Sequence, residues 1–257
     1  MAFALEPKAA WNTGAEAWEE FVTSGADYYR TEVHGPALLK ACGDLNGLSV
    51  LDIGCGQGYF SRLLKENGAG VVIGLDLSDK QIASAREHEA RTPLGIDYRV
   101  QDATHLSDLW PAATFDLVTG CMSLMDMEHP GDVLKAARQV LKPRGHLVFS
   151  VVHPVGNAAY REWERDADGH KVSLKIDRYF ESGPRIARWN MPRLDTPWET
   201  PYWSWTLAEW SETFADAGFV LRRLHEPRPT AEQVAALPDL EDCYRLPYFL
   251  LFDLSLA

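Results

Sequence analysis

Short apolar runs alternate with helical patterns through the middle of this chain. The runs cover residues 49–53, 71–77, 96–100, 115–119 and 146–152. Strands that alternate with helices of this length favour right-handed βαβ units and a parallel sheet that is covered on both faces. A helical stretch at 207–217 is followed by two more apolar runs, at 219–224 and 248–254. The pattern predicts an α/β fold with a seven-stranded, mostly parallel sheet, helices on both faces and an antiparallel edge strand.

Two regions interrupt this alternation. Residues 1–47 show a helical pattern with aromatic anchors such as Trp11 and Trp18, whereas residues 154–205 are rich in Pro and Trp and lack clear periodicity. A long aperiodic stretch in a compact domain is usually a functional cover. We therefore expect a single domain over 1–257, with a helical cover at 1–47, a core at 48–152, an aromatic lid inserted at 154–205, and a C-terminal helix and strands at 206–257.

The charge balance argues against several kinds of partner. Lys and Arg number 25 against 37 Asp and Glu, which gives a formal net charge of -12. A surface this acidic repels nucleic acid and anionic membranes. No apolar run approaches the roughly 20 residues that span a bilayer, and the first ten residues lack the features of a signal peptide. The cysteines at 42, 55, 121 and 243 show no disulfide framework, as in a reducing compartment. We expect a cytoplasmic protein that acts on a small molecule.

A glycine-rich turn follows the first predicted strand and leads into a helix. It reads Asp52-Ile53-Gly54-Cys55-Gly56-Gln57-Gly58, and its glycines let a ligand approach the backbone closely. A dinucleotide-binding turn needs a further glycine where this chain has Tyr59. Asp52 is expected to place a carboxylate at the mouth of the turn, which would repel a pyrophosphate and attract ammonium and sulfonium charges. The turn therefore favours a cationic nucleoside over NAD(P), and an NAD(P)-dependent oxidoreductase is the weaker alternative.

Two further acidic residues lie at the carboxyl ends of the next predicted strands, where open α/β sheets bind their ligands. Asp76 follows the turn by about twenty residues, a spacing at which a carboxylate accepts hydrogen bonds from ribose hydroxyls. Asp102, in Gln101-Asp102-Ala103, ends the following strand. We expect it at the edge of an adenine ring.

These motifs resemble those of the class I S-adenosylmethionine-dependent methyltransferases, and the small-molecule type 11 branch in particular. The segments that carry the resemblance are VLDIGCGQGYFSRLL, VIGLDLS, QDA, FDLVTGCMSL and VLKPRGHLVFSVVHP, within residues 48–152. The resemblance implies a Rossmann-like fold, S-adenosylmethionine as the cofactor and S-adenosylhomocysteine as the product. It implies that the methionine portion of the cofactor contacts Asp52, Gly54, Cys55, Gly56 and Gly58, and that the ribose contacts Asp76. It also implies that the adenine contacts Leu77, Asp102 and Ala103, and that the methyl-donor end contacts Cys121 and Met122.

The N-terminal segment offers a further contact to the cofactor. Tyr28, Tyr29, Arg30 and His34 either close over the methionine carboxylate or only dock the first helix. We predict that Tyr29 contacts the cofactor.

Methyl transfer from a sulfonium depends on alignment and exclusion of water, and needs a base only where the acceptor must lose a proton. His153 is the predicted base, because it ends the fifth strand near the expected methyl donor and an imidazole titrates near neutral pH. The alternative is a histidine that binds the covering segment or orients the substrate. We expect the acceptor pocket to include Trp11, Met125, Trp203 and Trp205.

The chain departs from the branch at one motif. Related enzymes often have a Tyr-His-Arg-type segment before the late helix, where this chain reads Tyr202-Trp203-Ser204-Trp205. A base or anion clamp from that segment is therefore not carried over. No metal site is expected, because the short cluster of Asp126, Glu128 and His129 is more typical of a helix-entry turn than of a ligand set.

The sequence thus predicts an enzyme that moves a methyl group from S-adenosylmethionine to a small acceptor, aromatic or carboxylate-bearing, in a natural-product or cofactor pathway. A non-catalytic protein that binds the same cofactor is the main alternative. Neither the acceptor atom nor the oligomeric state follows from the sequence.

Overall fold

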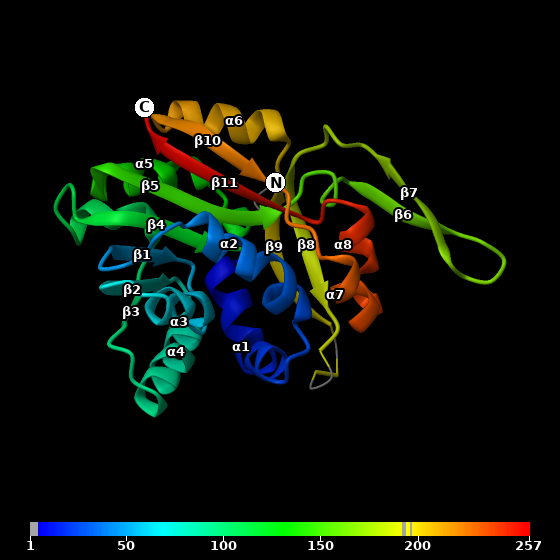
Figure 1. The fold of residues 1–257 in the computed structure, drawn as a ribbon, viewed down its shortest axis with the longest axis horizontal. Coiled ribbons are helices and arrows are strands. Elements are labelled where there is room, and N and C mark those ends of the chain that lie inside the picture. Colours follow the sequence, from blue (N-terminus) through cyan, green and yellow to red (C-terminus); the bar gives the residue numbers. More distant parts are fainter. Residues whose placement is uncertain (1–4, 192–193, 196) are drawn as a thin grey trace.

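The computed structural model describes residues 5–191, 194–195 and 197–257. Seven strands form the main sheet in the order β10-β11-β5-β4-β1-β2-β3 (Figure 1). Their bounds are β1 Ser49–Ile53, β2 Val71–Asp76, β3 Asp97–Val100, β4 Phe115–Cys121, β5 Leu141–Val152, β10 Phe219–His225 and β11 Phe249–Leu256. Strands β1 to β5 pair in parallel, whereas β11 runs antiparallel to both β5 and β10. This confirms the predicted Rossmann-like sheet with its antiparallel strand near one edge.

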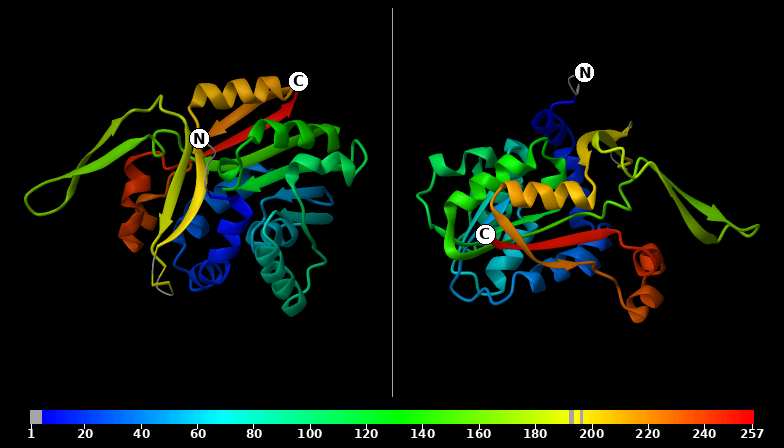
Figure 2. Two further views of the ribbon diagram at one scale, coloured as in Figure 1. Left: turned by 180° about the vertical axis from the view of Figure 1, so that it is seen from behind. Right: turned by 90° about the horizontal axis from the view of Figure 1, so that it is seen from above.

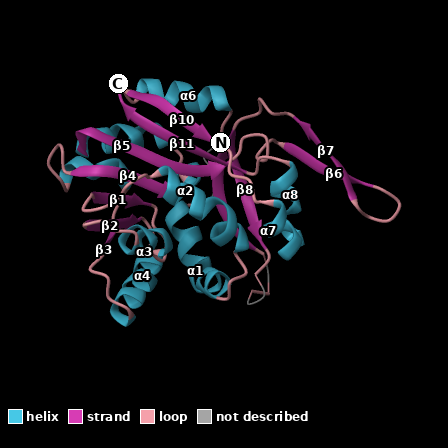
Figure 3. Ribbon diagram, in the orientation of Figure 1, coloured by secondary structure: helices cyan, strands magenta, loops and turns pink. Residues whose placement is uncertain are grey.

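Helices cover both faces of the sheet (Figure 3). The α-helices are α1 Pro7–Thr23, α2 Gly35–Ala41, α3 Tyr59–Glu66, α4 Asp79–Arg91, α5 Pro130–Val140, α6 Leu207–Asp216, α7 Ala231–Ala236 and α8 Glu241–Arg245. A π-helix, η1 Arg30–His34, and three 3-10 helices, η2 Ala103–Asp108, η3 Leu124–Asp126 and η4 Pro238–Leu240, connect other elements.

Two apolar clusters fix which helices lie on which face. Leu134 of α5 and Trp210 of α6 are buried in the cluster on one face. Leu38 of α2, Phe60 of α3 and Ile82 of α4 are buried in the cluster on the other. Because each helix repeats its apolar residues at helical spacing, burying that stripe against the sheet removes it from water. The two clusters therefore hold the carboxyl ends of β1, β2 and β4 in fixed positions.

The stretch from 154 to 205 contains two β-hairpins, which corrects the expectation of an irregular lid. They are formed by β6 Tyr160–Arg165 with β7 Lys171–Asp177, and by β8 Gly183–Trp189 with β9 Trp198–Ser204. The β6-β7 hairpin extends away from the rest of the chain in every view (Figures 1 and 2). Most of its residues are exposed, so its sequence lacks the alternation of a strand with one buried face. Residues 192, 193 and 196 of this stretch lie outside the described residues.

The β8-β9 hairpin packs against helix α1. The indole Nε1 of Trp198 donates a hydrogen bond to the carbonyl of Ala10 at 2.8 Å, and the ring lies where a Cβ at Gly14 would come within 2.0 Å. Glycine at position 14 is therefore required for this close approach. Trp11 and Trp18 of α1 contact the same ring at centroid distances of 5.1 and 6.2 Å. The expected helical cover at 1–47 is thus found in its described part, from residue 5 onward, and it is joined to the second hairpin.

The segment between β10 and β11 contacts the N-terminal cover as well. Tyr29 donates a hydrogen bond to the carbonyl of Asp239, and the side-chain amide of Gln233 donates one to the carbonyl of Glu32. These bonds place α7 and η4 beside η1. No helix among the described residues is long and apolar enough to cross a bilayer.

Candidate active site

A cavity of about 860 Å³ opens at the carboxyl ends of β1 to β4. This is the edge where the strand order reverses, because β1 lies between β2 and β4, and open α/β sheets bind ligands at such points. The sheet edge contributes residues 54–57, 75–78, 101–104 and 121–123 to its walls. Helices α1, η1 and η3 and the β8-β9 hairpin supply most of the remaining walls.

The glycine-rich turn after β1 has the geometry that only glycine adopts readily. Gly54, Gly56 and Gly58 have φ angles of +66°, +55° and +92°. A Cβ on Gly58 would lie 2.4 Å from the Tyr98 hydroxyl, so this glycine also allows close packing of the turn on β3. Gly54, Cys55 and Gly56 line the cavity as predicted, whereas Gly58 does not.

Asp52 does not lie at the mouth of the turn, and this corrects the sequence-based expectation. Its side chain is fully buried and does not line the cavity. One carboxylate oxygen accepts a 2.6 Å hydrogen bond from the Ser61 hydroxyl of α3. Burial raises the pKa of Asp52 to about 7. Asp52 is part of β1, and its side chain is enclosed between the strand and α3 beneath the turn. Its carboxyl group therefore does not face a ligand in the cavity directly.

Asp76 occupies the position that was expected for it, at the end of β2. Its two carboxylate oxygens accept hydrogen bonds from the backbone N–H groups of Gly56, at 2.9 Å, and Ser78, at 2.8 Å. Burial raises the pKa of Asp76, while these donors act in the opposite direction. The carboxylate is thus fixed between the glycine-rich turn and α4, and it faces the cavity.

The predicted adenine-binding positions line the cavity next to Asp76. Leu77 is exposed over 40% of its surface, although it is a large apolar residue, and Ala103 is buried. Asp102 begins η2, where its carboxylate accepts hydrogen bonds from the backbone N–H and the hydroxyl of Thr104, at 2.9 and 2.7 Å. An apolar slot with a carboxylate at its edge suits a flat ring that bears an amino group.

The residues that are predicted to contact the methyl-donor end lie at and just after the end of β4. Cys121 and Met122 both line the cavity, and Met122 has a φ of +55°, which is unusual for a residue other than glycine. The Met122 N–H donates to the Ser150 carbonyl and hydroxyl oxygens, each at 3.1 Å, and these bonds hold the strained turn. The Cys121 sulfur lies 3.8 Å from Nδ1 of His34. Burial raises the pKa of Cys121 to about 12 and lowers that of His34 to about 3, so both groups are neutral.

The N-terminal cover adds Tyr29 and Arg30 to the cavity wall. The Arg30 guanidinium lies over the Tyr59 ring, 4.3 Å from its centroid, and its Nε is 3.4 Å from a carboxylate oxygen of Asp27. This cation is largely buried and points to the side of the cavity next to the glycine-rich turn.

The structure does not bring His153 to the cavity, which corrects its predicted role as the base. The residue is 4% exposed and does not line the cavity, although the preceding Val152 does. Both ring nitrogens have partners: Nδ1 accepts a hydrogen bond from the Val155 N–H at 3.1 Å, and Nε2 lies 3.1 Å from the Glu226 carboxylate. Since successive residues of an extended chain point to opposite sides, Val152 faces the cavity and His153 faces away.

The same alternation explains the tryptophans of β9. Thr200 and Tyr202 line the cavity. Trp203, the next residue along the strand, is buried on the opposite side. Trp205 contacts the Trp210 ring of the core at 5.8 Å instead. The acceptor-pocket prediction is therefore wrong for Trp203 and Trp205, whereas Trp11 and Met125 do line the cavity.

Several cavity residues were not predicted from the sequence as individual ligand contacts. Asp126 follows β4, Arg161 lies on β6 and Tyr202 lies on β9. In the sequence, Asp126 stands out only as part of the short cluster with Glu128 and His129, which is typical of a helix-entry turn. A strand pattern in the 154–205 stretch would have placed Tyr202 on the opposite face from Trp203.

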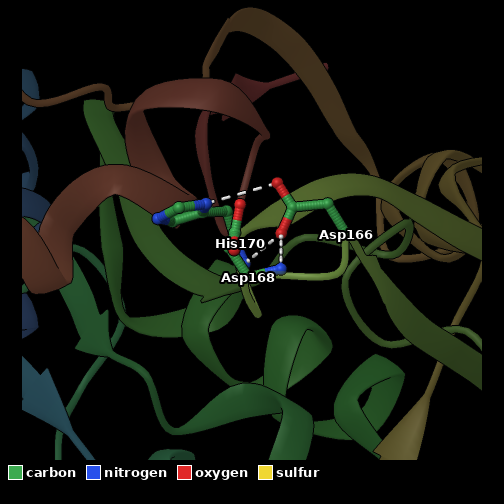
Figure 4. Close-up of side chains that lie close together, drawn as sticks. All are labelled: Asp166, Asp168 and His170. Atoms are coloured by element: carbon green, nitrogen blue, oxygen red, sulfur yellow. Dashed lines mark hydrogen bonds and ion pairs between the residues drawn. The ribbon is translucent and has the colours of Figure 1, made fainter.

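Three polar side chains gather at the tip of the β6-β7 hairpin (Figure 4). One oxygen of Asp166 accepts hydrogen bonds from the backbone N–H groups of Asp168 and His170, at 3.0 and 2.9 Å, and the other lies 3.2 Å from the His170 ring. All three residues are exposed. Because these bonds close the turn between β6 and β7, we assign the residues to the structure of the hairpin.

Comparison with known proteins identifies the family. Residues 51–149 match the family model described as a methyltransferase domain, type 11. The chain also matches the crystal structure of an S-adenosylmethionine dependent methyltransferase from Mesorhizobium loti with 32% identity and a TM-score of 0.71, over 85% of this chain and 95% of that one. The chain belongs to the S-adenosylmethionine-dependent methyltransferases. Within them it has the class I fold and the type 11 domain, as predicted, and S-adenosylmethionine is its cofactor.

More distant relatives agree with this methyltransferase assignment. A ubiquinone biosynthesis O-methyltransferase of Photobacterium profundum is 35% identical over 112 residues, which span 43% of this chain and 46% of that protein. The chain thus matches less than half the length of this relative. The DhpI–SAH complex shares the fold, with a TM-score of 0.60, 19% identity, and coverage of 98% of this chain and 95% of that one.

Proposed function

We propose that this methyltransferase acts in the cytoplasm on a small acceptor that is aromatic or carries a carboxylate, and that both substrates bind in the 860 Å³ cavity. The observation that supports this most is the composition of that one cavity. Its walls combine ten of the twelve residues predicted for the cofactor with an unassigned wall of aromatic and basic side chains. The cavity is within the usual range for small-molecule sites, whose volumes run from about 300 to 1,000 Å³.

For the cofactor we propose an arrangement along the sheet edge. Its methionine portion lies against Gly54, Cys55 and Gly56, with its carboxylate toward the buried Arg30 cation. Its ribose hydroxyls bind Asp76, whose carboxylate the backbone already holds in place. The adenine lies between Leu77 and Ala103, with its amino group at Asp102, and the methyl group is directed toward Met122.

The other half of the cavity supports the proposed acceptor class. Trp18, Phe21, Trp189, Tyr202 and Phe249 contribute aromatic surface to it, which suits a flat ring.

One cation in this wall is available for an anionic acceptor group. Lys8, Arg30 and Arg188 each lie within 3.4 Å of a carboxylate oxygen. Arg161, also on the wall, forms no such pair with any described residue and instead lies over the Tyr248 ring, 5.8 Å from its centroid. A guanidinium without an ionic partner can bind a carboxylate through two parallel hydrogen bonds.

A methyl-transfer assay tests this function. The enzyme is incubated with S-adenosylmethionine labelled in the methyl group and with three sets of acceptors: hydroxylated aromatic acids, their decarboxylated phenols, and matched aromatic amines. We expect labelled product from at least one set, and an Arg161→Gln variant that raises KM about tenfold for the acids and less than twofold for the phenols, in line with the loss of one charge-assisted pair. Absence of product from all three sets would contradict the proposed acceptor class.

A further inference from the structure

Asp126 is an acidic group in the cavity that neither the cofactor positions nor the Arg161 wall accounts for. It ends η3, the short helix that follows β4 and its methyl-donor residues Cys121 and Met122. Its neighbours Met125 and Met127 line the cavity together with it. The Asp126 carboxylate forms no hydrogen bond or ion pair with any residue that the structure describes. Its unpaired oxygens are therefore available to a bound molecule.

The surroundings of Asp126 place it between the two halves of the cavity. Helix η3 packs against β9 and β5. Toward the cofactor side, the Asp76 carboxylate lines the same cavity and acts on Asp126 electrostatically. Toward the acceptor side, Tyr202 of β9 is within electrostatic range of Asp126, and also of Arg161 and Arg185.

The remaining groups around Asp126 leave its carboxylate poorly solvated. The nearby part of β5 presents the apolar Val152 to the cavity, and Glu128 and His129, on the same loop as Asp126, are exposed at the rim. Burial, reinforced by the Asp76 charge, raises the pKa of Asp126 well above its ordinary value. A carboxylate with a raised pKa is a stronger base than an ordinary one.

The buried titratable groups nearby are less suited to take a proton. The His34 imidazole has a pKa of about 3, which makes it a weak base, and the Cys121 thiol has a pKa of about 12 and stays protonated at neutral pH. Asp27 is paired with Arg30. His153 lies outside the cavity with both ring nitrogens engaged.

We propose that Asp126 is a catalytic base that takes the proton of an acceptor hydroxyl, and that the enzyme therefore methylates oxygen. This inference rests on the proposed function and narrows its acceptor to the hydroxylated members. The acceptor oxygen forms a bond to the methyl carbon while the carbon–sulfur bond breaks. The electron pair of that bond stays on sulfur, which gives neutral S-adenosylhomocysteine, and the hydroxyl proton goes to Asp126.

The requirement for a base separates oxygen from nitrogen acceptors. A neutral amine attacks with its free electron pair and loses its proton to water afterwards. A hydroxyl is a poor nucleophile until a base removes its proton. An unpaired carboxylate next to the methyl-donor wall therefore assists methylation of a hydroxyl and is dispensable for methylation of an amine.

The cofactor charge provides a readout that does not depend on turnover. The positive sulfonium of S-adenosylmethionine stabilises the Asp126 carboxylate, whereas S-adenosylhomocysteine has no such charge. The ratio of the two affinities should therefore shift toward S-adenosylmethionine as the pH rises and Asp126 loses its proton. Asp27, Asp52 and Asp76 lie in or near the cavity and also have raised pKa values. The contribution of Asp126 is therefore the part of the change in affinity ratio that an Asp126→Asn variant abolishes.

The test compares the wild type with Asp126→Asn and with Asp132→Asn, a control on the exposed first turn of α5, where Asp132 pairs with Lys135 outside the cavity. Calorimetry measures both cofactor forms across pH, and the labelled-donor assay measures kcat and KM on phenolic and amine acceptors. We expect Asp126→Asn to lower kcat on phenols by about 10² to 10⁴-fold and to leave the S-adenosylhomocysteine Kd within about twofold. The variant should also lose the pH dependence of the affinity ratio and the acidic limb of the kcat profile. Asp132→Asn should match the wild type in all of these.

The outcomes separate this inference from the proposed function. Methylation of amines but not of phenols by the wild type would overturn the oxygen assignment and leave the small-acceptor proposal intact. A phenol rate that Asp126→Asn reduces by less than about threefold, or an unchanged acidic limb in that variant, would overturn the role of Asp126 alone. Absence of turnover with every acceptor set would overturn both.

Discussion

At the residue scale, burial sets what each acidic side chain near the glycine-rich turn does. Asp76 and Asp126 line the cavity, whereas Asp52 is enclosed beneath it and bonded to Ser61. All three have raised pKa values because burial disfavours the charged form. The carboxyl group that faces the cavity beside the turn is therefore that of Asp76, and the Asp52 carboxyl serves the packing of β1 on α3.

The raised pKa of Asp52 predicts a pH dependence of folding stability. Its folded pKa of about 7 lies above the unfolded value near 4, so the native state holds a proton that the unfolded chain has lost between these limits. The stability that this proton contributes is complete below about pH 4 and is lost as the pH rises through about 7, at up to roughly 1.4 kcal/mol per pH unit. Urea unfolding across this range should show a flatter profile for Asp52→Asn.

The control for this measurement is Asp108→Asn, an exposed change in η2 that should reproduce the wild-type slope. An Asp52→Asn profile as steep as that of the wild type would show that Asp52 is already ionised in the native state.

Replacement of Gly58 by alanine should destabilise the fold for two separate reasons. An alanine there combines a φ of +92° with a Cβ only 2.4 Å from the Tyr98 hydroxyl, whereas an alanine at Gly95 has a similar φ, +80°, with no heavy atom within 4 Å. We expect Gly95→Ala to lower the free energy of unfolding by about 1 kcal/mol, and Gly58→Ala by at least about 1 kcal/mol more, because overpacking adds to the backbone strain. Urea unfolding measures both, and equal losses would contradict the steric account.

At the element scale, the cavity depends on how α1 joins the sheet edge. The Asn12 amide accepts a 2.6 Å hydrogen bond from the Ser78 hydroxyl and donates a 3.0 Å bond to Asp79. Ser78 also caps α4 by accepting a bond from the Gln81 N–H at 3.1 Å. These contacts hold the N-terminal cover directly beside Asp76, so we expect that they open when the cofactor is released.

Asn12→Ala should therefore speed cofactor release. Loss of its hydrogen bonds removes about 1 kcal/mol of docking energy, so we expect the dissociation rate of S-adenosylhomocysteine to rise about fivefold in stopped-flow displacement. The matched control is Thr13→Ala, because the Thr13 hydroxyl bonds only to the carbonyl of Ala9 in the same helix. Equal dissociation rates for the wild type and Asn12→Ala would show that α1 does not limit release.

Some of these elements follow from the sequence pattern and others do not. The seven strands and the glycine-rich turn were predictable because a buried parallel sheet leaves continuous apolar runs and each turn glycine has a positive φ. The hairpins of 154–205 were not, since their exposed residues show no alternation of polar and apolar side chains. The errors at His153 and Trp203 share one cause: a shift of one residue along an extended chain moves a side chain to the opposite face. Trp205 lies beyond β9, where its ring packs against Trp210.

At the scale of the whole molecule, chain segments far apart in sequence enclose one cavity. The sheet edge supplies its floor, α1 and η1 cover it, and the β8-β9 hairpin with η3 lines the part that we propose for the acceptor. A site closed on several sides excludes water from the transferring methyl group and must open for product to leave. We propose that Asp76 anchors the cofactor in this cavity.

Calorimetric titration with S-adenosylhomocysteine tests that claim most directly. We expect one site in the wild type and an affinity about ten- to a hundredfold weaker in Asp76→Asn, since hydrogen bonds to a charged group contribute about 1.5 to 3 kcal/mol. The affinity of Asp97→Asn, an exposed control on β3, should be unchanged. Binding by Asp76→Asn as tight as that of the wild type, or the absence of binding by the wild type, would contradict it.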